Sequence, residues 1–166
     1  PMMPLAALWK SMNKFWKTVL TTTVLAGTAD IIAATLMAWM RSGKFPAKIL
    51  HYIAGGGLGL ERSMKGGAST ALLGLCFHYF IAFSFTLLFF LAFPRLVFLQ
   101  GNKYLTGFFY GQFVGMFMAF VVLPFSALPP RPFKLGNALI SWTVLSVAIG
   151  IPVAMMANKF YKSSTV

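Results

Sequence analysis

The sequence predicts an all-α membrane protein in which four transmembrane helices form a compact antiparallel bundle. Three observations support this prediction, and two of them concern composition: 58% of the 166 residues are hydrophobic, and only 10% are charged. The third is the presence of four apolar runs that each reach the roughly 20 residues needed to cross a bilayer. These runs are apolar on every face, unlike the alternating strands of a membrane barrel. The chain is therefore expected to be an integral membrane protein.

The four predicted spans are joined by short connections, which makes consecutive spans antiparallel neighbours. They are expected at residues 19–40, 68–93, 104–125 and 135–157. Together they form one transmembrane domain, 19–157, followed by a polar tail, 158–166. Membrane helices tolerate internal Gly and Pro, so Pro152 is expected to kink the fourth span rather than end it.

Residues 4–18 predict a separate interfacial amphipathic helix ahead of the first span. Apolar residues, two Trp among them, recur at helical spacing on one face. Three lysines fall on the other face, where they would meet lipid headgroups: Lys10, Lys14 and Lys17. Such a helix lies in the headgroup layer and sets the depth of the span that follows. A cleaved signal peptide is the alternative, but the apolar run is longer than a signal peptide requires.

Residues 41–67 contain a second short element, an interfacial or re-entrant helix that begins at Pro46 and is expected to end at Gly55. His51 falls within it and is expected on the surface. Several glycines follow, and flexible linkage or close backbone packing explains them best. A phosphate loop is disfavoured because no strand precedes the glycines and no Gly-Lys-Ser/Thr ending follows. Arg62 and Lys65 are candidates for holding a lipid phosphate.

The charge balance also favours a membrane surface, because 14 Lys and Arg face only two acidic residues, for a net charge of +12. The basic residues lie outside or at the ends of the spans, which indicates anionic lipid headgroups rather than nucleic acid as partners. They divide evenly between the two sides of the predicted topology, so the positive-inside rule selects no orientation. Both termini are expected in the cytoplasm, the commoner arrangement for four spans. With one cysteine and no recognised catalytic or metal constellation, we expect neither a cofactor nor an enzyme.

The third span carries a stripe of small residues at every fourth position: Gly107, Gly111 and Gly115, extended by Ala119. Such a stripe lets another helix backbone come close. The pattern does not say whether that helix belongs to the same chain, to a second copy or to a larger membrane complex. A contact within the chain is favoured, because a four-helix bundle needs a close seam.

The candidate functional residues are ionisable side chains near the middle of the spans. Asp30 lies on a small-residue face of the first span, and His78 lies on a similar face of the second. A charged side chain at the bilayer centre costs about 2.5–3.5 kcal/mol on insertion scales, so it is retained only where something compensates it. We expect Asp30 and His78 to meet as a buried polar pair or as part of a proton or ion relay. Gln112, Ser141 and Ser146 are expected to extend the pair into a polar cluster.

Several motifs in order along the chain support a resemblance: Ala26-Gly27-Thr28-Ala29-Asp30, Ile49-Leu50-His51-Tyr52-Ile53-Ala54-Gly55-Gly56, Gly74-Leu75-Cys76-Phe77-His78-Tyr79-Phe80-Ile81-Ala82-Phe83 and Ala157-Asn158-Lys159-Phe160-Tyr161. With these motifs the chain resembles the YagU-like family of small bacterial inner-membrane proteins of unknown function. The resemblance implies the four-span architecture and a bacterial inner-membrane location, but no activity. The amphipathic helix at residues 4–18 has no counterpart in it.

Three functional classes follow from these observations. The favoured one is a non-catalytic accessory, structural or lipid-interacting membrane protein in which the Asp30–His78 pair fixes helix register. The alternative is a small proton- or cation-coupled transporter or channel that uses Asp30 and His78. A membrane enzyme ranks third, because one acid and one histidine within the spans form no recognised catalytic site.

Overall fold

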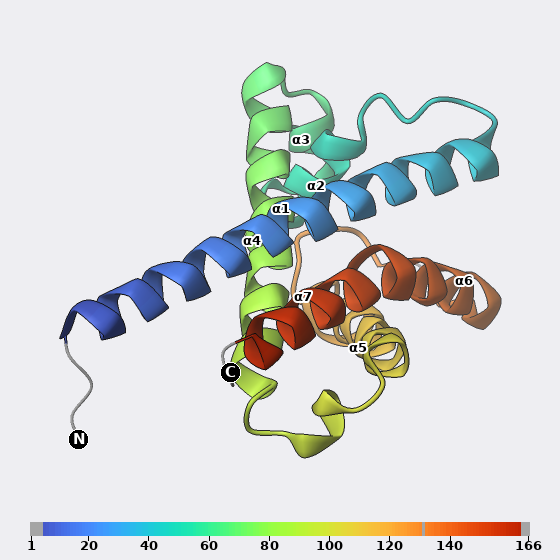
Figure 1. Ribbon diagram of the computed structural model, residues 1–166. Helices are drawn as coiled ribbons and strands as arrows, with labels where there is room; N and C mark the ends of the chain where they lie inside the picture. Colours follow the sequence, from blue (N-terminus) through green and yellow to red (C-terminus); the bar gives the residue numbers. More distant parts are fainter. Residues whose placement is uncertain (1–4, 131, 164–166) are drawn as a thin grey trace.

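The computed structural model describes residues 5–130 and 132–163, with side chains described from residue 9 onward, and these ranges contain helices and no strand. The elements in chain order are α1 (Leu5–Ser42), α2 (Ile49–Leu58), α3 (Leu60–Met64), α4 (Ala68–Ala92), the 3-10 turn η1 (Val97–Gln100), α5 (Lys103–Phe117), the π-helical turn η2 (Met118–Val122), α6 (Leu135–Leu145), the π-helical turn η3 (Ser146–Gly150) and α7 (Ile151–Lys162) (Figure 1). Four helical segments are long and apolar enough to cross a membrane: Trp9–Ser42, Ala68–Ala92, Lys103–Val122 and Leu135–Lys162. The all-helical class with four candidate spans is therefore confirmed.

The predicted amphipathic helix and the first span form one continuous helix, α1, so the expected boundary after residue 18 is absent. No Gly or Pro occurs between residues 5 and 26, and nothing else interrupts the backbone hydrogen bonding there. One side of the N-terminal part of α1 packs against the protein, where Val19 is fully buried and Phe15 contacts Phe90 and Phe160. Residue 4 of the predicted helix and residues 164–166 of the predicted polar tail lie outside the described residues.

The short helix α2 runs through the glycines that were expected to end it and stops only at Gly59, where φ is 81°. One of its glycines, Gly57, allows close packing against α4, and Gly74 of α4 does the same from the other side. A Cβ at Gly57 would lie 2.8 Å from Cε2 of Phe77, and a Cβ at Gly74 on α4 would strike the carbonyl oxygen of Leu50. Packing against α4 therefore compensates the weak helix propensity of Gly in α2.

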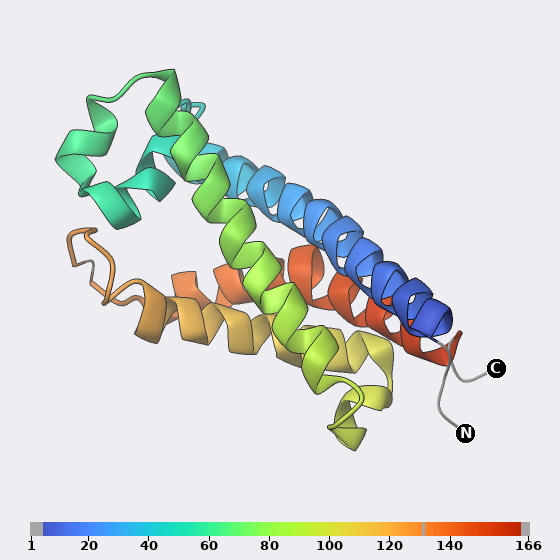
Figure 2. The ribbon, with the colours of Figure 1, turned by 90° about the vertical axis from the view of Figure 1, so that its left-hand side faces the viewer.

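The first and fourth spans approach each other at both ends. Lys14 near the start of α1 lies 3.4 Å from Ser163 after α7, whereas Arg41 near the end of α1 lies 3.4 Å from Ser141 on α6. α1 therefore runs opposite to α6 and α7. In Figure 1, α4 stands upright while α5 is seen end-on and α1 crosses diagonally, and Figure 2 shows the same steep crossings from the side.

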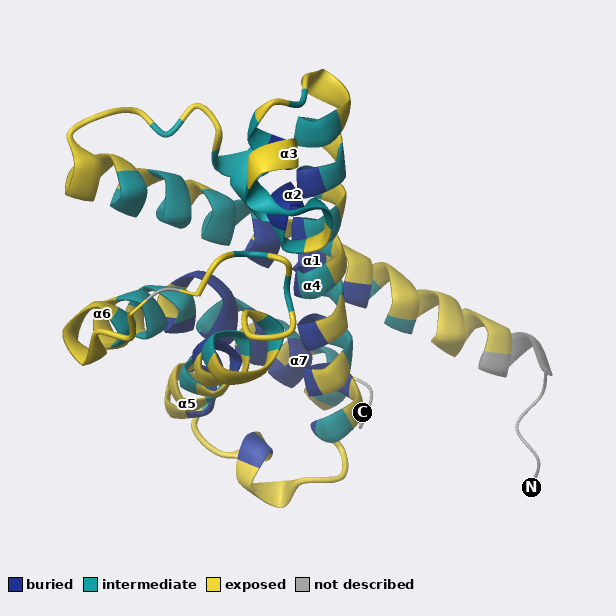
Figure 3. Cartoon of the chain, turned by 180° about the vertical axis from the view of Figure 1, so that it is seen from behind, coloured by how far each residue is buried: buried dark blue, intermediate teal, exposed yellow. Residues whose placement is uncertain are grey.

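Buried residues gather where the helices cross, while the N-terminal part of α1 is largely exposed (Figure 3). The apolar core joins α1, α4 and α7 through Val19, Phe89, Phe90 and Val153. In the fourth span, the π-helical turn η3 directly precedes Ile151 and Pro152. Because proline lacks an N–H and its ring clashes with the preceding turn, a wider turn accommodates it without ending the helix. The helix then continues beyond the predicted end at residue 157, to Lys162.

Candidate functional site

The candidate site lies where α1 crosses α4, and small residues bring the two helices together there. Ala26 and Gly27 on α1 and Ala82 on α4 are all buried. A Cβ added at Gly27 would lie 3.0 Å from the Tyr79 ring and 3.3 Å from Cβ of Ala82. The small-residue faces that the sequence placed around Asp30 and His78 therefore form the contact between the helices.

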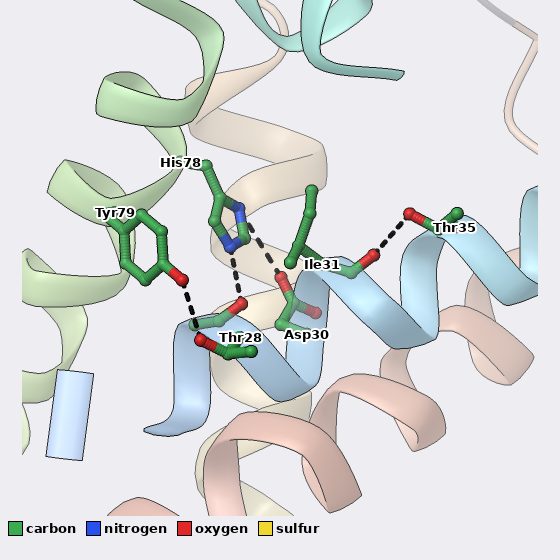
Figure 4. A network of polar contacts seen from close by, with 7 residues as sticks. Thr28, Asp30, Ile31, Thr35, His78 and Tyr79 are labelled. Carbon is green, nitrogen blue, oxygen red and sulfur yellow. Dashed lines mark hydrogen bonds and ion pairs between the residues drawn. The ribbon is translucent and has the colours of Figure 1, made fainter. Parts of the chain in front are cut away.

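His78 ties α4 to the backbone of α1. Its Nε2 lies 2.7 Å from the carbonyl oxygen of Gly27, and because that oxygen can only accept, Nε2 donates the hydrogen bond (Figure 4). The other ring nitrogen, Nδ1, faces Oδ2 of Asp30 at 4.0 Å. That separation is too long for a hydrogen bond between the two side chains. Asp30 and His78 are thus brought together, but their facing atoms are not hydrogen-bonded to each other.

Among the residues that the structure describes, none donates a hydrogen bond to the Asp30 side chain, and its ion-pair contact is with Nδ1 of His78. The Asp30 side chain is 19% exposed and the His78 side chain 10% exposed. Asp30 precedes the end of α1 at Ser42 by twelve residues, or about 18 Å at 1.5 Å per residue. In a hydrocarbon core about 30 Å thick that begins at Ser42, the carboxylate would lie near the middle.

Asp30 and His78 line an open cavity of about 590 Å³, to which α1, α2, α3, α4, α5 and the fourth span also contribute residues. Most of the lining side chains are aliphatic or aromatic. The other polar members are Lys48 and Tyr52, near the connection between α1 and α2. The apolar wall includes Ile31, Ala34, Ile53, Ile81, Val114 and Ile149. An apolar cavity with a few convergent polar groups is the usual form of a small-molecule site.

Gln112 belongs to a different place, which corrects the expected polar cluster. Its Nε2 donates to Oγ of Ser146 at 3.0 Å, across the contact between α5 and η3. Neither side chain lines the cavity, and no described hydrogen bond joins them to Asp30 or His78. Ser141 instead accepts from Arg41 at 3.4 Å. These polar groups lie on helix faces that sequence spacing alone could not orient toward one another.

The glycine stripe packs within the chain, against the fourth span. A Cβ at Gly107 would lie 2.6 Å from the Cα of Ile151, and at Gly111 it would strike the Cα of Ser146. At Gly115 it would meet the Trp142 ring. These three glycines therefore pack within the chain, as the favoured interpretation of the stripe expected.

The predicted headgroup residues are all exposed: Lys10, Lys14, Lys17, Arg62 and Lys65. Lys14 also lies 5.6 Å from the centre of the Phe160 ring, and Lys65 forms a 2.6 Å ion pair with Glu61. Exposed ion pairs one helical turn apart contribute about 0.3–0.5 kcal/mol, so this pair leaves Lys65 available to lipid. The headgroup role stays a prediction.

Sequence reasoning missed three parts of the site. Oγ1 of Thr28 and the hydroxyl of Tyr79 are hydrogen-bonded at 2.7 Å, parallel to the bond between His78 and Gly27 (Figure 4). The sequence contained a signal for this bond, because Thr28 directly follows Gly27 and Tyr79 directly follows His78. The second part is α2, which forms one wall of the cavity. The third is His51, which is half-buried with Nε2 3.1 Å from the carbonyl oxygen of Gly66 rather than lying on the surface.

Comparisons of the chain with protein-family models, with curated proteins and with solved structures find no match. Among the described residues, no three His, Cys, Asp or Glu side chains are grouped closely enough to hold a metal ion. The functional argument therefore rests on the geometry of the crossing and its cavity.

Proposed function

We propose that this protein is a non-catalytic, lipid-interacting membrane protein that holds a lipid-like amphiphile in the cavity beside Asp30 and His78. One observation carries the proposal: Asp30 lines a mostly apolar cavity, and no hydrogen bond joins its side chain to the described residues. An ionised carboxylate within a membrane span costs free energy unless a donor or an opposite charge stabilises it. A polar group on a molecule in the cavity would provide that compensation.

The helix crossing does not depend on Asp30 for its register, which separates this proposal from a purely structural role. Two hydrogen bonds hold α1 and α4 together, one from His78 to the Gly27 carbonyl and one between Thr28 and Tyr79. Neither bond includes the Asp30 side chain. The acid is therefore free to serve a ligand, in contrast to the expectation that the Asp30–His78 pair fixes the register.

The size and lining of the cavity suit a hydrocarbon chain with a small polar head. Ligand sites in proteins commonly measure about 300–1,000 Å³ and are mostly apolar, and this cavity falls within that range. The remaining parts of the proposal rest on the sequence: a bacterial inner-membrane location, cytoplasmic termini, a compact antiparallel arrangement in the bilayer and membership of the YagU-like group. Exposed basic residues at both ends would hold the spans against anionic headgroups.

A photoreactive neutral alkanol tests the proposal directly, because a molecule in the cavity will label the residues that line it. In lipid nanodiscs, we expect mass spectrometry to find label on Ile53 and Val114. The substitution Ala34→Phe fills the cavity and should remove that label. Leu36→Phe adds a ring at a position that is half exposed on the same helix, and should leave the label in place. Labelling confined to exposed faces, unchanged by Ala34→Phe, would contradict an amphiphile site.

Transport of a proton or cation is the second candidate, and one observation favours it. The same cavity extends from Asp30 and His78 to Lys48 at the connection between α1 and α2, which is the form of an access path from one membrane side. Liposomes containing wild type, Asp30→Asn or Glu61→Gln would decide between the candidates. Flux lost only in Asp30→Asn would support transport. Equal flux in all three, or none, would leave the amphiphile site as the function of the cavity.

A further inference from the structure

We infer that the amphiphile in this cavity carries a primary or secondary ammonium group, which donates hydrogen bonds to both Asp30 and His78. The inference rests on the proposed function, since it names the head group of the molecule held there. Two facing acceptor atoms and the distribution of charge along the cavity lead to it.

The first step concerns the two facing atoms. Because Nε2 of His78 donates its proton to the Gly27 carbonyl, Nδ1 of the neutral ring carries a lone pair. Oδ2 of the Asp30 carboxylate is also an acceptor, and the two atoms are 4.0 Å apart. Two acceptors cannot satisfy each other. A nitrogen with two N–H groups can lie about 2.8–2.9 Å from each of them, which is ordinary hydrogen-bond distance.

The second step concerns charge. A positive head group would form a charge-assisted hydrogen bond with Asp30, which is about twice as strong as a neutral one. Among the described lining residues the basic one is Lys48, whose Nζ donates to the carbonyl oxygen of Met64 at 2.7 Å. The cavity wall therefore carries an acid on α1 and a base just before α2. This polarity directs a cationic head toward Asp30 and would direct an anionic head toward Lys48.

The third step concerns the rest of the molecule. Between the two polar ends the wall is aliphatic and aromatic, with Ile31, Ile53, Ile81 and Phe85 among the lining residues. A small inorganic cation would leave these surfaces without contacts, whereas an alkyl chain would cover them. A quaternary ammonium would supply charge but no N–H donor. These differences separate the inferred ligand from its nearest chemical relatives.

The experiment is competition against the neutral photoreactive alkanol in phosphatidylcholine nanodiscs, whose lipid has no N–H donor. The competitors share one chain length: dodecylamine, dodecanol, dodecyltrimethylammonium and dodecanoate. One charge-assisted hydrogen bond is worth roughly tenfold in affinity, so dodecylamine should compete about tenfold better than the trimethyl compound. That preference should disappear in Asp30→Asn and persist in the control Glu61→Gln. Comparing variants in the same membrane removes differences in partitioning.

The outcomes separate the inference from the proposed function. Failure of all four competitors, with no label in the cavity, would overturn the proposed function itself. Equal competition by the amine, the alcohol and the trimethyl compound in wild type would retain the amphiphile site and overturn the ammonium. If dodecanoate competes best and this competition is lost in Lys48→Gln, the inferred ammonium would be overturned in favour of an anionic head group. The wild-type comparison decides the matter even if Asp30→Asn fails to fold.

A final arm identifies where the ammonium comes from. Phosphatidylethanolamine carries a primary ammonium on a lipid, so nanodiscs containing it should protect the cavity from the alkanol if a lipid head group is the natural occupant. Such protection, absent in Asp30→Asn, would support the inference with a lipid as the source. Protection by dodecylamine alone would support it with a free lipophilic amine as the source. The absence of protection by either would overturn it.

Discussion

Two of the helix crossings in this protein, between α5 and the fourth span and between α1 and α4, are built in opposite ways. Between α5 and the fourth span, the backbones touch, and Gly107 and Gly111 leave no room for a side chain. Between α1 and α4, the helices meet at one small-residue contact, and beside it lies a cavity of about 590 Å³ with an acid on its wall. Both crossings would face the same lipid, so the difference reflects the side chains and not the surroundings.

Satisfaction of the polar groups shows the same difference. We call the close crossing the glycine seam and define it by Gly107, Gly111, Gly115 and Gly150. In this seam, the hydroxyl of Ser146 donates to the carbonyl oxygen of Phe108 at 2.9 Å and accepts from Gln112 at 3.0 Å. In the open crossing, the carboxylate of Asp30 has no donor from the described residues. A region that serves only stability satisfies its polar groups internally. Nδ1 of His51 and Oγ1 of Thr86 are also buried without a hydrogen-bond partner from the described residues, but unlike Asp30 neither residue lines the cavity. Asp30 therefore marks the region that can bind a ligand.

The largest effect is expected from filling the glycine seam. In Gly111→Val, the new Cβ would strike the backbone of Ser146, which cannot move aside as a flexible side chain could. Overpacking usually costs about 1–3 kcal/mol, and a backbone clash belongs at or above the upper end, so we expect a loss of about 3 kcal/mol or more. Reversible unfolding in mixed micelles would measure the free energy of unfolding.

Gly136 provides the matched control for this substitution. It lies on α6 in the same span, and a Cβ added there meets nothing within 4 Å. Gly136→Ala should therefore keep or raise the stability, by up to about 1 kcal/mol from helix propensity. Equal losses in the two variants would mean that the seam is not closely packed.

A smaller effect is expected from removing the bond that holds the open crossing. His78→Phe keeps a ring at the same position but loses the hydrogen bond from Nε2 to the Gly27 carbonyl. Hydrogen bonds between membrane helices contribute about 1–2 kcal/mol in model peptides, and we expect a loss in this range. The control is Phe80→Leu, an exposed neighbour on α4, which should change the free energy of unfolding little. If His78→Phe has the same free energy of unfolding as wild type, the hydrogen bond from His78 to Gly27 does not stabilise the crossing.

The second bond across the open crossing should contribute less. Tyr79→Phe removes the hydroxyl that bonds Oγ1 of Thr28 at 2.7 Å, and such bonds average about 0.6 kcal/mol in a measured membrane protein. A double-mutant cycle with Thr28→Val measures the interaction energy of the pair. Because each single change already breaks the same bond, the loss in the double mutant should be smaller than the sum of the two single losses. Additive losses from the two changes would show that these side chains do not interact in the membrane.

The sequence predicted the parts of these crossings that depend on spacing along one helix. The stripe from Gly107 to Gly115 and the small residues around Asp30 follow from residues one turn apart, and both lie at helix contacts. Residues at mid-depth on consecutive spans were also expected to approach, and Asp30 and His78 do. These inferences needed only the periodicity of a helix and the length of a span.

The sequence could not predict features that depend on how helices rotate and cross. Gln112 is at a suitable depth to join Asp30, yet the rotation of α5 turns it toward Ser146. The glycines of α2 look like a helix end, but contact with α4 keeps that helix intact to Leu58. The cavity itself has no signal in the sequence, because its wall is assembled from several separate segments. Tertiary packing decided each of these outcomes.

The smallest effect on stability is expected from the residue that we consider most important for function. Asp30→Asn removes the charge but keeps the shape, and no described donor is left without its acceptor. We therefore expect the free energy of unfolding in micelles to change by less than about 0.5 kcal/mol, or to rise because burial of a carboxylate is no longer required. A loss larger than that of His78→Phe would instead place Asp30 among the residues that build the crossing. The open crossing would then resemble the glycine seam, with its acid retained for packing and not for a ligand.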